Sequence, residues 1–127
     1  MRAAAGTAYL DRGSGVEIHY GAGRPARIDG TVGSLIAVEV ESRVSKQVRG
    51  AVLDLICHPY PKKLLILMPV HMNDADITAQ QCRYILGKFL ATNSFRVVVL
   101  EGTGETPQHQ LDVESVREAL FQLGFTP

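Results

Sequence analysis

Apolar and polar residues follow two different periods along this chain, and the change between them marks out the expected elements. In the early part, alternating or short apolar stretches of strand length are separated by glycine-containing turns. Links this short join antiparallel neighbours. The strands expected from this pattern are residues 16–20, 26–32 and 34–41, which together form an antiparallel meander.

Helix-length and strand-length segments alternate in the rest of the chain. Apolar residues that recur every three or four positions predict three amphipathic helices, and two continuous apolar runs predict strands that are buried on both faces. Strand–helix–strand crossovers of this length form parallel, right-handed units. The helices are expected at 42–58, 77–92 and 112–124, and the strands at 63–69 and 95–101. The predicted fold is therefore α/β: a mixed five-stranded sheet, made of an antiparallel meander plus parallel strands, flanked by helices.

Two glycines bear on the placement of the helices. Gly50 lies inside the first predicted helix, where glycine costs roughly 1 kcal/mol relative to alanine. This cost predicts that the helix approaches the sheet closely at Gly50. Gly124 ends the last helix, and Phe125 is expected to fold back over that end.

Length and composition narrow the class of protein. The chain has 127 residues, 46% of them apolar and 20% charged, which is typical of a single soluble domain. Its 13 basic and 13 acidic residues cancel, so nucleic-acid binding by overall charge is excluded and a local basic patch would be needed. The longest apolar run, residues 64–70, is too short to span a membrane, and residues 1–13 lack the apolar core of a signal peptide. We expect a cytoplasmic protein with free thiols at Cys57 and Cys82.

Three carboxylates are expected to meet at one end of the meander. Glu39 and Glu41 share a face of their strand, with Cα atoms roughly 6.5–7 Å apart. A tight turn at residues 33–34 pairs two strands so that Asp29 lies beside residues 37–39. Alternation alone favours the simpler interpretation, in which Glu39 and Glu41 form the solvated face of the strand. Converging carboxylates would instead bind a hard divalent cation such as Mg²⁺ or Mn²⁺, which offsets their mutual repulsion.

A run of basic residues follows the acidic ones. Residues 41–63 include five basic and two acidic residues. Arg43, Lys46 and Arg49 belong to the first predicted helix, and two lysines at 62–63 precede the next strand. A cationic rim beside a carboxylate cluster suits a phosphate-bearing substrate, although Arg49 equally suits a solvated helix face.

The run from Asp29 through nine residues to Glu39-Val40-Glu41 resembles the catalytic motif of the PD-(D/E)xK nucleases, the restriction-endonuclease-like superfamily. The resemblance covers roughly residues 16–101 and includes a helix directly after the third strand. In that family an Asp on the second strand of a meander and a Glu or Asp on the third bind Mg²⁺. The third motif residue, usually Lys, helps to activate the attacking water.

The resemblance implies a role for each motif residue. Asp29 and Glu39 take the metal-ligand positions for Mg²⁺ or Mn²⁺, and Glu41 takes the third catalytic position. Gln47 falls where some members of the family carry a helix glutamine beside the site. Two positions depart from the family pattern. Ile28 replaces the Pro of the motif, and Glu41 replaces the Lys, which excludes a lysine-assisted mechanism.

The interpretation that follows is a Mg²⁺-dependent nuclease-like protein that hydrolyses DNA phosphodiester bonds. Arg43, Lys46 and Arg49 would bind the substrate, and Lys46 would also stabilise charge that develops in the transition state. The alternative is a catalytically inactive protein of the same fold, which binds nucleic acid or a protein partner without hydrolysis. Cutting both strands of a duplex suits two-fold symmetry, so a homodimer is expected.

Overall fold

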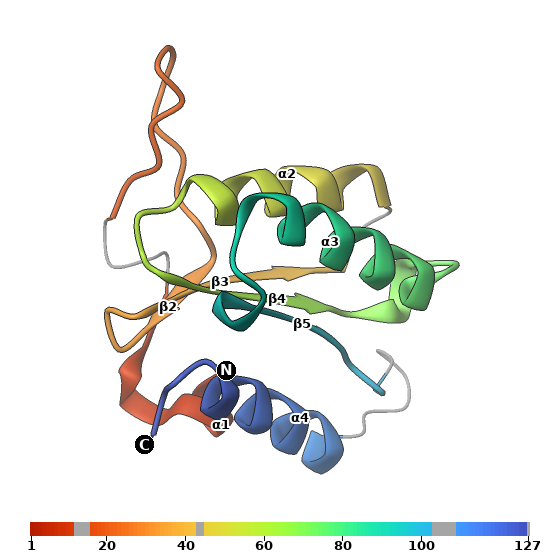
Figure 1. The fold of residues 1–127 in the computed structure, drawn as a ribbon. Coiled ribbons are helices and arrows are strands. Elements are labelled where there is room, and N and C mark those ends of the chain that lie inside the picture. Colours follow the sequence, from red (N-terminus) through yellow and green to blue (C-terminus); the bar gives the residue numbers. More distant parts are fainter. Residues whose placement is uncertain (12–15, 43–44, 103–108, 127) are drawn as a thin grey trace.

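The computed structural model describes residues 1–11, 16–42, 45–102 and 109–126, with only the backbone described at residues 2, 45, 46 and 71. Its strands are β1 Tyr9–Asp11, β2 Gly30–Val32, β3 Ile36–Glu41, β4 Lys62–Leu67 and β5 Phe95–Val99. They form one sheet in the order β1-β2-β3-β4-β5, which is also their order along the chain (Figure 1). β2 pairs antiparallel with β1 and β3, whereas β4 pairs parallel with β3 and β5.

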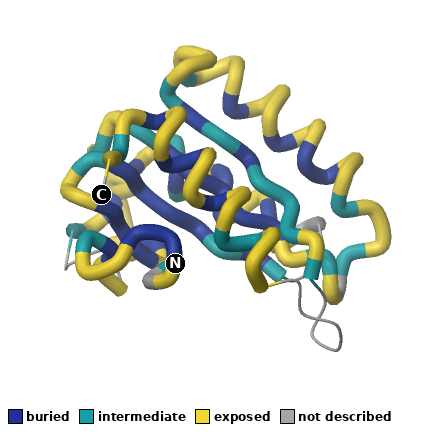
Figure 2. The backbone as a smooth tube through the Cα atoms, turned by 90° about the horizontal axis from the view of Figure 1, so that it is seen from below, coloured by how far each residue is buried: buried dark blue, intermediate teal, exposed yellow. Residues whose placement is uncertain are grey.

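Helices cover both faces of this sheet, which places the buried strands between exposed helix surfaces (Figure 2). α2 and α3 pack on one face, and α1 and α4 on the other. The helices are α1 Arg2–Ala5, α2 Ser45–Cys57, α3 Ala75–Phe89 and α4 His109–Gln122, with short 3₁₀ turns η1 Gly6–Ala8, η3 Pro69–His71 and η4 Thr92–Ser94. The predicted α/β fold with a mixed five-stranded sheet and parallel later strands is confirmed. Among the described residues, no helix is both long enough and apolar enough to cross a membrane.

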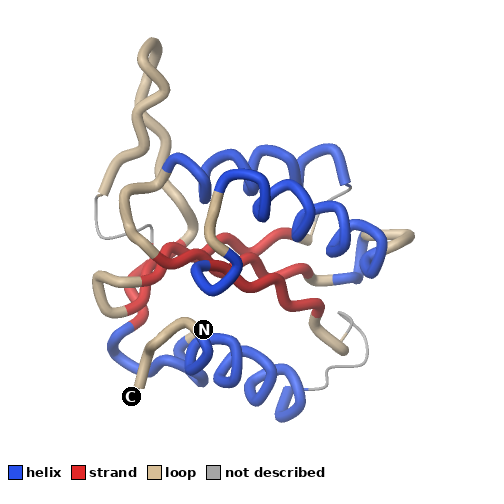
Figure 3. Tube along the Cα trace, in the orientation of Figure 1, coloured by secondary structure: helices blue, strands red, loops and turns tan. Residues whose placement is uncertain are grey.

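The first strand of the meander does not lie where the sequence pattern places it. The prediction of a sheet strand at residues 16–20 is wrong, because Tyr9–Asp11 takes that position beside β2. Residues 16–28 instead form an arm on the side of α2. Ile18 and Ile28 at its base are buried in the core beneath α2 and α3, and the rest of the arm projects beyond the sheet (Figure 3). A single antiparallel bridge joins Ile18 and Ala26 across the arm, with N···O distances of 2.7 and 2.9 Å. Alternation indicates which side chains of a segment share a face, but it does not specify the partner strand.

One apolar core lies on each face of the sheet, and β3 contributes to both. Ile36 and Val38 belong to the core beneath α1 and α4, whereas Ala37 belongs to the core beneath α2 and α3. Successive side chains of a strand point to opposite faces. Glu39 and Glu41 therefore lie on the same face as Ala37, beneath α2 and α3.

The two glycine predictions have different outcomes. Gly124 has a left-handed φ of 97°, and the Phe125 N–H donates to the Leu120 carbonyl at 2.9 Å. The Phe125 side chain packs on the core beneath α1 and α4, so the predicted fold-back is confirmed. The predicted close approach at Gly50 is wrong, because Gly50 is exposed and nothing lies within 4 Å of the position that its Cβ would take.

A close approach occurs instead at Gly30, the first residue of β2. Gly30 pairs with Asp11 on one side and with Val38 on the other. The ring of Tyr9 occupies the space that a Cβ at Gly30 would need, and its hydroxyl approaches the main-chain oxygen of Asp29 at 3.5 Å. The Tyr9 ring is itself buried. It therefore covers the start of β2 directly beside Asp29.

Candidate active site

Asp29 and Glu39 lie side by side where the pairing of β2 and β3 ends. Gly30 pairs with Val38, so the next positions along the two strands are Asp29 and Glu39. Their carboxylates accept backbone hydrogen bonds across the strands: the Asp29 N–H donates to Glu39 Oε1 at 3.2 Å, and the Val40 N–H donates to Asp29 Oδ2 at 2.8 Å. The predicted position of Asp29 beside residues 37–39 is confirmed. Each carboxylate is held by the strand that carries the other one.

The surroundings of Glu39 disfavour a negative charge on its carboxyl group. Glu39 is only 7% exposed, and burial is the main reason why its pKa is raised to about 8. The carboxylates of Asp29 and Asp54 raise the pKa further, Glu41 adds a smaller increase, and the hydrogen bond from the Asp29 N–H lowers it. Glu39 therefore holds a proton at neutral pH unless a cation takes its place.

Asp54 and Tyr20 also belong to this site, although neither is among the residues predicted from the motif. Asp54 lies half-buried on α2, and the Tyr20 hydroxyl donates a hydrogen bond to its Oδ1 atom. Burial and the neighbouring Asp54 carboxylate raise the pKa of Tyr20 above its ordinary value, and Cys57 and Glu39 contribute smaller increases. The arm and α2 thus meet above the Asp29–Glu39 pair.

A sequence signal for Asp54 does exist. Gln47 and Asp54 are seven residues apart, which places them on the same face of an α-helix. Because the resemblance already places Gln47 beside the site, the same helix face indicates Asp54. No comparable signal exists for Tyr20, because its contact with α2 depends on the direction in which the arm projects.

Glu41 ends β3 and is only 4% exposed. The interpretation of Glu39 and Glu41 as a solvated strand face is therefore wrong, since α2 and α3 cover this face of the sheet.

Among the residues that the structure describes, no group of three or more His, Cys, Asp or Glu side chains is arranged to hold a metal ion. The hydrogen bonds that cross the strands join Asp29 and Glu39, whereas Glu41 lies on the same face as Glu39 and contributes to its raised pKa. Two carboxylates still fit Mg²⁺, which commonly keeps several waters and takes only one or two protein carboxylates.

The lysines at 62–63 do not form the expected cationic rim. They begin β4 and pair with the first residues of β3, so they lie at the opposite end of β3 from Glu41. Lys63 is 3% exposed, and its ammonium group donates to the His58 carbonyl just after the end of α2. Burial lowers the pKa of Lys63 to about 8. This lysine therefore satisfies a carbonyl at the negative end of the helix dipole.

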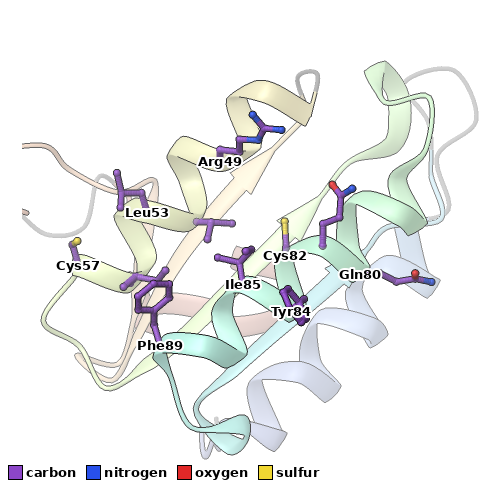
Figure 4. Close-up of a pocket in the computed structure, with 11 residues that line it drawn as sticks. Arg49, Leu53, Cys57, Gln80, Cys82, Tyr84, Ile85 and Phe89 are labelled. Carbon is purple, nitrogen blue, oxygen red and sulfur yellow. The ribbon is translucent and has the colours of Figure 1, made fainter.

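The other predicted basic residues belong to α2 or directly precede it. Arg43 lies outside the described residues, and for Lys46, in the first turn of α2, only the backbone is described. Gln47 is exposed in the same turn. Arg49 is also exposed, and it lines a groove between α2 and α3 (Figure 4). Arg49 and Asp54 are five residues apart and so do not share a helix face.

The arm carries two exposed arginines that are not among the predicted substrate-binding residues, Arg24 and Arg27. Arg27 precedes Asp29 by two residues, so both lie on the segment that leads from the arm into β2. Along the chain Arg27 is the basic residue nearest to Asp29, whereas the lysines of β4 lie at the far end of β3 from Glu41.

Comparisons of this chain with protein-family models, with curated proteins and with solved structures find no match.

Proposed function

We propose that Asp29 and Glu39 bind Mg²⁺ or Mn²⁺, and that this chain is a metal-dependent nuclease-like protein that hydrolyses DNA phosphodiester bonds. The observation that carries the proposal is the close approach of two carboxylates on neighbouring strands, one of them buried with a pKa raised to about 8. Carboxylates this close are stabilised by a shared proton or by a cation. A divalent ion bound there would polarise a phosphate and lower the pKa of a bound water.

The order of the site residues along the fold also supports the proposal. Asp29 directly precedes the second strand of the meander, Glu39 lies on the third strand, and α2 follows the third strand. This is the order that the resemblance to PD-(D/E)xK nucleases implies. In hydrolysis the water oxygen bonds to phosphorus, and the bond from phosphorus to a sugar oxygen breaks. Glu41, in the third motif position, would accept the proton of the water, and the released sugar oxygen would take a proton from solvent.

Digestion of single-stranded and double-stranded DNA tests the proposal. The wild-type chain should cleave at least one form with Mg²⁺ or Mn²⁺ and neither form with EDTA. Asp29→Ala should lower the cleavage rate by at least about tenfold, because it removes a metal ligand. Glu114→Gln is the matched control, since Glu114 is an exposed carboxylate on α4, across the sheet from the site. If the wild type cleaves no DNA form with any divalent ion, the alternative of a non-hydrolytic binding module is favoured.

Lys46→Ala should lower the cleavage rate by about tenfold and leave Mn²⁺ affinity nearly unchanged, because we assign Lys46 to the scissile phosphate and not to the metal. Gln47→Ala should have a smaller effect, since a neutral hydrogen bond contributes less than a charged one. Single-turnover rates measure the first quantity, and calorimetry measures the second. A wild-type rate in Lys46→Ala would refute this assignment.

A further inference from the structure

The outer surface of α2 and α3 carries a groove of about 850 Å³ (Figure 4). Four large hydrophobic residues that line it are exposed, and we call them the α2–α3 surface: Leu53, Tyr84, Ile85 and Phe89. Cys57 and Arg49 line the same groove. The groove lies on the outer side of the two helices, away from the sheet on which Asp29 and Glu39 lie (Figure 4).

The residues of the α2–α3 surface are far more exposed than apolar residues of this size usually are. Leu53 is 52% exposed, Tyr84 65%, Ile85 39% and Phe89 66%. Because an aromatic side chain presents 150–250 Å², these four residues leave roughly 400 Å² of side chain uncovered. A patch of about this size is typically the largest that a single chain carries, and such patches are often functional.

The charge distribution around the groove indicates what kind of partner fits it. Among the described residues that line it, Arg49 alone is charged, and it lies with Gln80 toward one end (Figure 4). Leu53, Cys57 and Phe89 lie toward the other end. An apolar centre with a few polar residues at its margin is typical of a protein–protein interface. Nucleic acid would require a basic lining, and the described residues of this groove supply only Arg49.

We propose that the α2–α3 surface binds the same surface of a second copy of this chain and forms a two-fold symmetric dimer. The surface offers both parts of a self-complementary contact, with the projecting rings of Tyr84 and Phe89 beside a groove. Two-fold symmetry uses every such contact twice.

The area and the charge both suit a second copy. Two copies would bury roughly 800 Å² through these four side chains, which is at the low end of protein–protein interfaces and suits a weak dimer that forms at micromolar concentrations. The zero net charge of the chain means that no overall repulsion opposes the pairing. The proposal does not depend on the proposed nuclease function, because it uses a different surface.

Light scattering on the full chain tests the proposal. At about 50 µM the wild type should have twice the 13.8 kDa chain mass, and Phe89→Glu and Leu53→Glu should each raise the dimer dissociation constant by at least about tenfold. Phe121→Glu is the matched control, because Phe121 is 64% exposed on α4, on the opposite face of the sheet. It should remain dimeric. A wild-type chain that stays monomeric at this concentration, or equal disruption by Phe121→Glu, would overturn the proposal.

Thiol labelling of the wild-type chain gives a second measurement of the same interface. Cys57 is exposed and Cys82 is buried in the single chain, so Cys57 is the thiol that a reagent should reach first. In the dimer Cys57 lies at the covered groove, so its labelling should slow several-fold as the protein concentration rises. In Phe89→Glu the labelling rate should be fast at every concentration. A wild-type labelling rate that is independent of concentration would contradict the proposed interface.

Discussion

The free energy of unfolding should fall by up to about 2 kcal/mol as the pH rises from 6.5 to 8, and Glu39→Gln should remove most of this fall. The pKa of Glu39 is raised from 4.5 to about 8 in the folded chain. Between these two values the folded state holds one more proton than the unfolded chain. The resulting stabilisation is complete below pH 4.5 and is lost as the pH rises through 8, at about 1.4 kcal/mol per pH unit.

Two other buried groups set the window in which the Glu39 effect is visible. Burial, and then the charge of Lys63, lower the pKa of His58 from 6.5 to about 4, so its contribution to stability rises with pH over that interval. Burial lowers the pKa of Lys63 from 10.5 to about 8, so its contribution rises with pH above 8. The slope that Glu39 produces is therefore least opposed between pH 6.5 and 8.

Urea unfolding at several pH values in this window, with EDTA present, measures the effect. The difference in stability between Glu39→Gln and wild type should grow by up to about 2 kcal/mol from pH 6.5 to 8 in favour of the variant. Glu114→Gln should follow the wild-type curve. Parallel curves for wild type and Glu39→Gln would show that Glu39 does not titrate in this range. Added Mg²⁺ should reduce the wild-type slope if the ion replaces the proton on Glu39.

Gly30→Ala should destabilise the chain by about 3 kcal/mol. Its φ is not left-handed, so the cost comes from packing: the new methyl group would overlap the Tyr9 ring. Because Tyr9 is 8% exposed and Gly30 pairs on both sides, neither the ring nor the strand can move aside freely. Chemical unfolding of the variant measures the loss.

A double-mutant cycle separates this overlap from any general intolerance of β2 to alanine. In a Tyr9→Leu background, Gly30→Ala should cost less than about 1 kcal/mol, because the ring that it strikes is gone. Gly50→Ala is the matched glycine control and should stabilise the chain by about 0.5–1 kcal/mol, since Gly50 is exposed in α2 with open space at its Cβ position. Equal losses from Gly30→Ala in both backgrounds would contradict the role of Tyr9.

The sequence predicts the sheet best where periodicity and short connections decide the structure. The continuous runs behind β4 and β5, and the crossover through α2, require parallel pairing, and the structure has it. The failure lies at β1. Tyr9–Asp11 is only three residues long, too short to show a period, and its position depends on the Tyr9 ring covering Gly30. The sequence pattern therefore predicts the first strand at the longer alternating segment, residues 16–20, instead of at Tyr9–Asp11.

For the candidate site, too, the sequence predicts the features that local pairing determines and misses those that depend on tertiary packing. The tight turn at residues 33–34 fixes the register of β2 and β3, so the meeting of Asp29 and Glu39 follows from the sequence. The burial of Glu39 does not, because alternation gives the face of a strand and leaves open whether a helix covers it. The approach of Asp54 and Tyr20 depends on how α2 and the arm pack together, which is a tertiary contact.

The agreement between spatial and chain order in the sheet has a consequence for how the chain folds. Every strand pairs with its predecessor in the sequence, so the sheet can extend by one neighbouring strand at a time, without pairing strands from the two ends of the chain. The contact between the first and last helices is different. The Arg117 guanidinium donates to the Ala3 carbonyl at 2.9 Å across 114 residues. Joining α1 to α4 closes this large loop, and we expect it late on the folding pathway, after the sheet has brought both helices to the same face.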